Sequence, residues 1–164
     1  MSRGFVKDND QEEVPLLTPR AYLPPGAVNY VTPEGLKALV EERDEISRER
    51  QQLIDRGREG DRVQINYLGA KINQIEERLS SARVVEKEES AGDTVKFGAL
   101  VRMKKEDGCD CSYRIVGVDE ADISAGKISY ISPLARVLTG RREGETVEFK
   151  TPAGIKKLKI QKIE

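Results

Sequence analysis

The chain has 164 residues and a formal net charge of −1, and 35% of its residues are charged while only 5% are aromatic. This composition disfavours one large hydrophobic core and favours a long solvated helical element. The sequence has no histidine, which excludes Ser-His and Cys-His nucleophile pairs and the usual zinc ligand sets, and it has no apolar run long enough to cross a membrane.

Prolines and acidic residues dominate residues 1–31. An acidic cluster at residues 8–13 precedes four prolines, and no helical or strand period survives. We therefore expect an extended arm, partly disordered before about residue 14. Its apolar side chains either pack on the folded part or on a partner, or belong to a floppy leader. These side chains are Leu16, Leu17, Tyr22 and Leu23. The chain does not begin with a secretory pattern, so we expect a cytoplasmic protein.

Residues 32–86 have the pattern of an antiparallel helical hairpin. Thr32 suits an N-cap and Pro33 suits the first helical position. Apolar residues then recur at spacings of three and four, as along the seam of a coiled coil. Arg43 and Arg50 interrupt this seam in the first half. In the second half the seam residues are Ile65, Leu68, Ile72, Ile75, Leu79 and Ala82.

A charged turn separates the two expected helices. Gly57 and Gly60 stand among charged residues, which is typical of a turn rather than a core. The acids of this tip are Asp55, Glu59 and Asp61. Carboxylates on such a finger can complete a metal site that a partner holds, but most helical hairpins simply have a polar tip. From the residues alone, an ordinary polar tip is the favoured interpretation.

Residues 93–164 predict a separate, strand-rich domain. A charged linker at residues 87–92 ends in glycine, and after it the apolar period changes to two over residues 94–104. Asp107-Gly108 then indicates a hairpin turn between this strand and the next one. The first part of the domain is therefore expected to be an antiparallel strand pair.

A short helix is expected after a strand at residues 127–131. Ser132 suits its N-cap, Pro133 its first position, and Gly140 its end. The result is a small α+β domain in which one short helix covers a mostly antiparallel sheet. Residues 127–164 carry nine Lys or Arg and four Glu. This basic balance indicates either an anionic partner surface or lysines that protect a sheet edge, and the two interpretations are equally supported.

Two further groups in this domain are candidates for chemistry. Asp119, Glu120 and Asp122 follow a strand, where acids are ordinary turn formers, and we favour that role over metal or proton chemistry. Cys109 and Cys111 are separated by one residue, so a disulfide between them would be strained. We expect two free thiols and no metal site.

Six segments carry a family resemblance. They are Lys127–Leu138, Gly144–Val147, Thr151–Gly154, Arg114–Asp122, Val31–Leu36 and Leu79–Val85. Together they resemble the bacterial Gre transcription elongation factors, GreA and GreB. The resemblance covers roughly residues 31–164, and it is specific in the C-terminal domain and patchy in the hairpin. Residues 1–30 form an extension before the usual start of the family.

The resemblance implies an α+β fold: an N-terminal antiparallel α-helical coiled-coil hairpin and a small FKBP-like antiparallel β domain with one short helix. It implies a monomer that is not itself an enzyme, that binds RNA polymerase and that meets nucleic acid only indirectly, within the elongation complex. The C-terminal domain would dock at the rim of the secondary channel and the hairpin would enter it. The docking surface would contain Ser132, Pro133, Leu134 and Arg136.

The tip matches the family only in part. In the family, an Asp and a Glu three residues later help the polymerase to hold a second Mg²⁺ and a water, so that the polymerase cuts backtracked RNA. Asp61 matches the first acid, but Gln64 stands at the second position, and Glu59 is a candidate substitute. Any Mg²⁺ at the tip would be held by the polymerase, since the chain has no cofactor of its own. The second arm also looks shorter than the family's, by roughly two to three helical turns.

Three functions therefore stay open. The chain could be a cleavage factor with an altered tip, or a channel-binding modulator without cleavage activity. It could instead be a coiled-coil interaction module, in which Arg43 and Arg50 at seam positions specify a partner helix. Polymerase regulation, without a claim of cleavage, is the favoured hypothesis.

Overall fold

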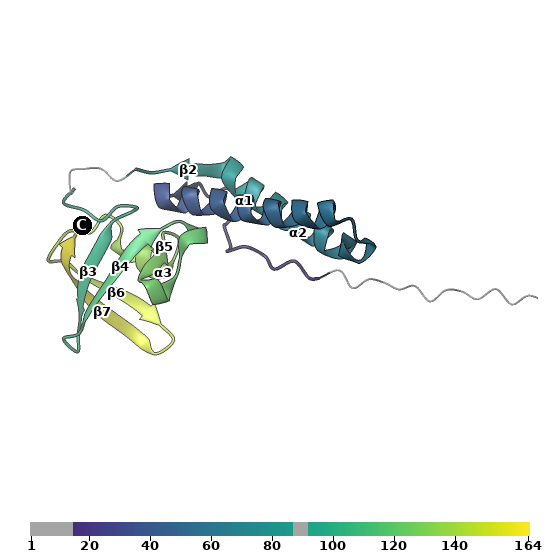
Figure 1. Cartoon of the computed structure of the whole chain (residues 1–164). Coiled ribbons are helices and arrows are strands. Elements are labelled where there is room, and N and C mark those ends of the chain that lie inside the picture. Colours follow the sequence, from purple (N-terminus) through teal and green to yellow (C-terminus); the bar gives the residue numbers. More distant parts are fainter. Residues whose placement is uncertain (1–14, 87–91) are drawn as a thin grey trace, which may run out of the picture.

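The computed structural model describes residues 15–86 and 92–164, and it consists of a long helical hairpin and a β-rich C-terminal domain (Figure 1). The expected disorder before about residue 14 lies outside the described residues. The hairpin projects from one side of the domain, and its tip is the part farthest from the sheet (Figure 1). Within the described ranges, none of the helices has the length and apolar character that a membrane span requires.

The hairpin consists of α1, Pro33–Arg56, and α2, Arg62–Ser81. As predicted, the Thr32 side chain caps α1 by accepting a hydrogen bond from the Gly35 amide at 3.0 Å. Gly57 ends α1 in the left-handed conformation, with φ of 66°, which a residue without Cβ adopts at little cost. The seam is apolar as expected, and its side chains are Leu39, Ile46, Leu53, Tyr67, Leu68, Ile72, Ile75 and Leu79. Ile65 and Ala82, which were also expected in the seam, are not part of this cluster, and Ala82 lies beyond the end of α2.

The two arginines that interrupt the seam are satisfied within the hairpin itself. Arg43 of α1 pairs with Asp44 and lies 3.6 Å from Glu76 of α2. Arg50 donates from Nε to the carbonyl of Ile65 at 3.2 Å. Both guanidinium groups therefore already have partners among the described residues: acidic side chains for Arg43 and a backbone carbonyl for Arg50.

The base of the hairpin ends in a small parallel sheet. Strand β1, Asn29–Val31, pairs with β2, Ala82–Val84. Helix α2 therefore ends at Ser81, earlier than the expected boundary near residue 86. The physical reason is the pairing of Ala82–Val84 with β1, together with the β-branched Val84 and Val85, which favour extended backbone.

The C-terminal domain contains a five-stranded sheet in the order β5-β4-β3-β7-β6. Its elements are β3 Leu100–Lys105, β4 Asp110–Val116, β5 Lys127–Ser129, α3 Pro133–Leu138, β6 Thr146–Thr151 and β7 Gly154–Ile163. This confirms the α+β class and the short helix. The sheet is antiparallel except between β4 and β5, which run parallel. The expected first strand at 94–104 begins only at Leu100.

One hydrophobic core holds this domain together. Ala135 and Leu138 of α3 are fully buried against the sheet, which fixes the helix over one of its faces. The buried core residues are Val95, Val101, Met103, Ile115, Ile128, Ala135, Leu138, Val147, Leu158, Ile160 and Ile163. The other face of the sheet is lined by polar side chains, so the architecture has two layers.

Candidate functional site

The tip of the hairpin contains both acids that the sequence singled out. Glu59 and Asp61 bound a short 3-10 helix between α1 and α2. The carboxylate of Asp61 accepts two hydrogen bonds from Arg56, at 2.8 Å from Nε and 2.7 Å from Nη2. Its side chain is only 16% exposed. Asp61 therefore lies at the tip with its charge already neutralised by a bidentate arginine.

Glu59 differs from Asp61 in its surroundings. Among the residues that the structure describes, its side chain is exposed and makes no hydrogen bond or ion pair. Asp55, the third acid near the tip, accepts a hydrogen bond from Gln51 at 2.7 Å. The described residues form no group of three or more candidate metal ligands. The tip therefore offers one free carboxylate rather than a metal site of its own.

The four residues of the expected docking surface start helix α3. Ser132 is the N-cap and accepts a hydrogen bond from the Ala135 amide at 3.3 Å. Pro133 and Arg136 are exposed, and Leu134 is partly buried. Of these four, Leu134 also lines a cavity between α3 and the sheet, so it joins the helix to a concave surface.

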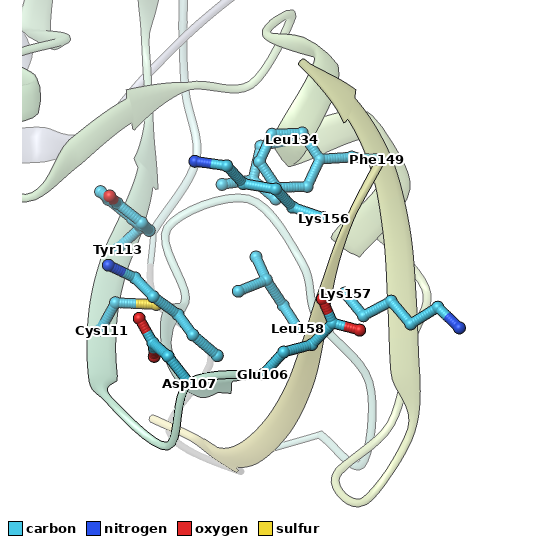
Figure 2. Close-up of a pocket in the computed structure, with 10 residues that line it drawn as sticks. Glu106, Asp107, Cys111, Tyr113, Leu134, Phe149, Lys156, Lys157 and Leu158 are labelled. Atoms are coloured by element: carbon cyan, nitrogen blue, oxygen red, sulfur yellow. The ribbon is translucent and has the colours of Figure 1, made fainter. Parts of the chain in front are cut away.

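That cavity has a volume of about 360 Å³ and an apolar floor with a charged rim. Figure 2 shows Leu134 beside Phe149, with Tyr113 and Cys111 on the β4 side and Leu158 between them. The charged rim residues are Lys105, Glu106, Asp107, Lys156 and Lys157. An apolar hollow with a few charged groups around it is the usual form of a site that receives an anchoring side chain.

The two cysteines near this cavity are free thiols, as predicted. A hydrogen bond with Asp107 raises the pKa of Cys109, and burial raises the pKa of Cys111. A raised pKa makes a thiol a weaker nucleophile and a weaker metal ligand than an ordinary cysteine.

Comparison with known proteins identifies the family. Residues 89–164 match the family described as "Transcription elongation factor, GreA/GreB, C-term". The transcription elongation factor GreB of Neisseria meningitidis serogroup B is 36% identical over 152 residues, which cover 83% of this chain and 93% of that protein. The chain belongs to the GreA/GreB family of transcription elongation factors. GreA of Anaeromyxobacter is 44% identical to this Gre-family chain over 99 residues, or 60% of each chain.

Solved structures of Gre-type proteins also align with this family member. The GreA factor homolog Gfh1 of Thermus thermophilus aligns with 84% of this chain and 99% of its own, at 22% identity and a TM-score of 0.41. A GreA/GreB factor from Nitrosomonas europaea aligns with 82% of this chain and 97% of its own, at 20% identity and a TM-score of 0.41.

In this Gre-family chain, Glu120 of the C-terminal domain reaches the start of α1. Its carboxylate accepts hydrogen bonds from the Thr32 amide at 3.1 Å, from the Thr32 hydroxyl, and from the Gly117 amide at 3.0 Å. A Cβ at Gly35 would lie 2.0 Å from Cδ of Glu120, so glycine at this helical position makes room for the carboxylate. A negative charge is favourable at this positive end of a helix.

Asp119, the neighbouring acid, contacts the hairpin from the same loop. Its carboxylate accepts a hydrogen bond from Nε of Arg20 at 2.8 Å, and its Oδ2 lies 3.4 Å from Nε of Arg78 in α2. That oxygen accepts no hydrogen bond within the described structure. The contact with Arg78 is therefore an ion pair without hydrogen-bond alignment, and Arg20 makes the better-directed interaction.

An aromatic cluster adds a further contact between the base of the hairpin and the C-terminal domain. We call the region where these two parts meet the joint. Tyr30 of β1 lies 5.8 Å from Phe97 and 5.5 Å from Tyr130 between ring centroids, and Phe97 lies 5.7 Å from Tyr130. These separations are typical of favourable aromatic pairs. Because Tyr30 belongs to the hairpin base and the other two rings to the C-terminal domain, the cluster packs one part of the chain on the other.

The sequence reasoning identified Asp119 and Glu120 but assigned them only a turn. They do lie in a tight turn, the 3-10 helix η2 at Val118–Glu120, yet their side chains bind residues far away in the sequence. The signal that could have revealed them is Gly35, a glycine inside a well-formed helix, which indicates a close approach by another group. Tyr113 and Phe149 of the cavity were likewise missed as candidate site residues.

Proposed function

We propose that this chain regulates transcription elongation by binding RNA polymerase, with the C-terminal domain docked at the rim of the secondary channel and the hairpin inserted into it. Membership of the Gre family supports this proposal. The shape supports it as well. Helix α1 has 24 residues and is therefore about 36 Å long, and it projects as a rod one helix pair thick (Figure 1). A monomer of this shape suits a narrow channel.

The cavity beside α3 is the docking feature that we assign to the polymerase. Its apolar floor of Leu134, Phe149 and Leu158 can receive an apolar side chain. Lys156 on the rim favours an acidic neighbour on the partner. Lys157 takes no part in this, because it points away from the cavity (Figure 2) and pairs with Glu148 at 3.2 Å.

We propose further that the hairpin acts by occupying the channel rather than by stimulating cleavage. The observation that carries this is the bidentate pair between Arg56 and Asp61. A carboxylate held by an arginine is a weak ligand for a metal that the polymerase holds, because the arginine already neutralises its charge. Gln64, at the position of the family's second acid, can accept a hydrogen bond but adds no charge.

Stimulated RNA cleavage is the second candidate, and Glu59 is the observation in its favour. This carboxylate is exposed and unpaired in the described part of the chain. Placed in the channel, it would supply an anionic oxygen of the kind that Mg²⁺ prefers. The third hypothesis, an independent coiled-coil module, loses its support because Arg43 and Arg50 have partners in their own hairpin.

A cleavage assay on backtracked elongation complexes separates the first two candidates. Wild type, Asp61→Ala and Glu59→Ala should all leave cleavage at the intrinsic rate of the polymerase, while wild type slows or alters elongation. Wild-type stimulation that Glu59→Ala or Asp61→Ala removes would establish the second candidate. Stimulation that appears only in Arg56→Ala would show that the Arg56–Asp61 ion pair prevents the tip from stimulating RNA cleavage.

Binding to core polymerase tests the docking step separately. Leu134→Ala should weaken binding about tenfold or more, because it removes an apolar wall of the cavity. Ile123→Ala is the matched control, since Ile123 is exposed in a short 3-10 helix and does not line the cavity. Equal affinities for the two variants would contradict the assigned surface. Recovery of a helical partner without polymerase subunits would contradict the proposed function as a whole.

A further inference from the structure

The described part of the N-terminal arm, residues 15–31, lies along the base of the hairpin. The Thr18 carbonyl accepts a hydrogen bond from Gln74 at 3.5 Å, and the Ala21 carbonyl accepts one from Arg78, both on α2. The Val28 carbonyl accepts one from the hydroxyl of Tyr130 in the C-terminal domain. The described part of the arm is thus attached to α2 and to the domain, and Figure 1 shows it running beside the hairpin.

Arg20 is the residue of the arm that contacts both other parts of the chain at once. Its Nη1 and Nη2 donate to Glu42 of α1 at 3.0 and 3.1 Å, and its Nε donates to Asp119 of the C-terminal domain at 2.8 Å. A single planar guanidinium therefore joins three segments: arm, helix and domain. This use of several donors in a fixed fork is available to arginine and not to lysine.

Burial makes this contact costly to break. The side chain of Asp119 is 5% exposed and that of Arg20 is 18% exposed. Burial disfavours the charge of Arg20, but the hydrogen bonds to Glu42 and Asp119 outweigh it, and the pKa of Arg20 is raised. Without Arg20, the Asp119 carboxylate would keep only the poorly aligned Arg78, and a buried charge without a good partner destabilises the arrangement that buries it.

We propose that Arg20 is a positioning residue through which the N-terminal arm sets the direction of the hairpin relative to the C-terminal domain. The segment Val118–Glu120 contacts the start of α1 through Glu120 and α2 through Asp119. These two contacts fix the angle between the hairpin and the C-terminal domain. Arg20 ties the second of these contacts to Glu42 on α1. Through Arg20, the arm, α1 and the C-terminal domain are held together by one set of hydrogen bonds. We call this three-segment contact the clamp.

Spin-label distances between tip and domain test this proposal without any polymerase. Labels at Arg58→Cys and Gln161→Cys, in a Cys109→Ser and Cys111→Ser background, report the distance by double electron–electron resonance. Arg20→Ala should shift and widen the distance distribution. Arg43→Ala is the matched control, because this arginine makes its ion pairs with Asp44 and Glu76 inside the hairpin. A distribution that Arg20→Ala leaves unchanged, or that Arg43→Ala widens equally, overturns the proposal.

Amide hydrogen exchange locates the change. In Arg20→Ala, the amides of Thr32 and Gly117, which donate to Glu120, should exchange about tenfold faster or more. The amide of Gly144, which donates to Ile160 inside the domain, should not change. Adding Arg20→Ala to Asp119→Asn should produce little further effect. Faster exchange at Gly144 as well, or fully additive effects of the two substitutions, would show a general loss of stability and overturn the clamp.

Discussion

The tip and the base of the hairpin both carry paired acids, but they pair in different ways. At the tip, Asp61 binds Arg56 and Asp55 binds Gln51, partners five and four residues away. At the base, Glu120 binds Thr32 and Asp119 binds Arg20, partners 88 and 99 residues away. Local pairs shape a turn, whereas distant pairs fix how two parts of a chain sit on each other.

This difference separates two roles that acidic residues can have. The tip pairs contribute little to stability, because Gln51 and Asp55 are exposed and Arg56 is 45% exposed, although its partner Asp61 is only 16% exposed. The base pairs are largely buried, so they can be lost only together with the arrangement that they hold. On our proposal, the base pairs set the direction of the hairpin, while the tip pairs shape only the turn between the two helices.

The largest expected effect is the loss of stability caused by Ile75→Ala near the base, which is compared with Ile54→Ala near the tip. Ile75 is fully buried near the base, and Ile54 is 40% exposed near the tip. Ile75→Ala should lower the free energy of unfolding by about 2–5 kcal/mol, because it leaves a cavity in the seam. Ile54→Ala should cost about 1 kcal/mol or less. Urea denaturation followed by helical circular dichroism measures both, and equal losses would contradict the comparison.

The elements of the fold could be predicted because their signals lie within a few residues. The seam period, the Thr32-Pro33 start of α1 and the Ser132-Pro133 start of α3 are all local patterns, and the structure confirms them. The early end of α2 was missed, since it depends on β1 as a partner strand. Pairing between distant segments cannot be read from a local period.

The candidate site was predictable to the same extent and for the same reason. The position of Glu59 and Asp61 between the helices follows from local glycines and charges, and their action on a polymerase stays a prediction. The sequence does not predict the ion pair with Arg56, because any of the three arginines around the tip, Arg56, Arg58 and Arg62, could have faced Asp61. The joint was missed altogether, since nothing near Glu120 in the sequence indicates that Thr32 is its partner.

Alanine in place of a glycine at each end sharpens the comparison. Gly35→Ala places a Cβ against the Glu120 carboxylate, while at Gly60 a Cβ meets nothing within 4 Å. Alanine gains up to about 1 kcal/mol of helix propensity at position 35. It loses the hydrogen bonds to a charged carboxylate, worth about 1.5–3 kcal/mol. We expect a net loss of about 1 kcal/mol for Gly35→Ala and no loss for Gly60→Ala, measured by urea denaturation.

The Glu120→Ala background serves as the control for this prediction. With the carboxylate absent, nothing opposes alanine at position 35, so Gly35→Ala should become stabilising by up to about 1 kcal/mol. The sign of the effect should therefore reverse between the two backgrounds. A destabilisation by Gly35→Ala that persists in Glu120→Ala would mean that the glycine is needed for another reason.

The smallest expected effect belongs to the ion pair at the tip. Arg56 is 45% exposed, so Arg56→Ala should lower the free energy of unfolding by about 0.5 kcal/mol or less. Salt should abolish this difference, because the Debye length falls to about 3 Å at 1 M. Arg78→Ala at the base should keep its larger loss in the same salt, since both partners of that pair are at least 86% buried, with 14% and 5% exposed. Urea denaturation at low and high NaCl measures the two differences. If the Arg78 difference vanished with salt as the Arg56 difference does, the base would be no better shielded than the tip, and its pairs could not hold the hairpin in a fixed direction.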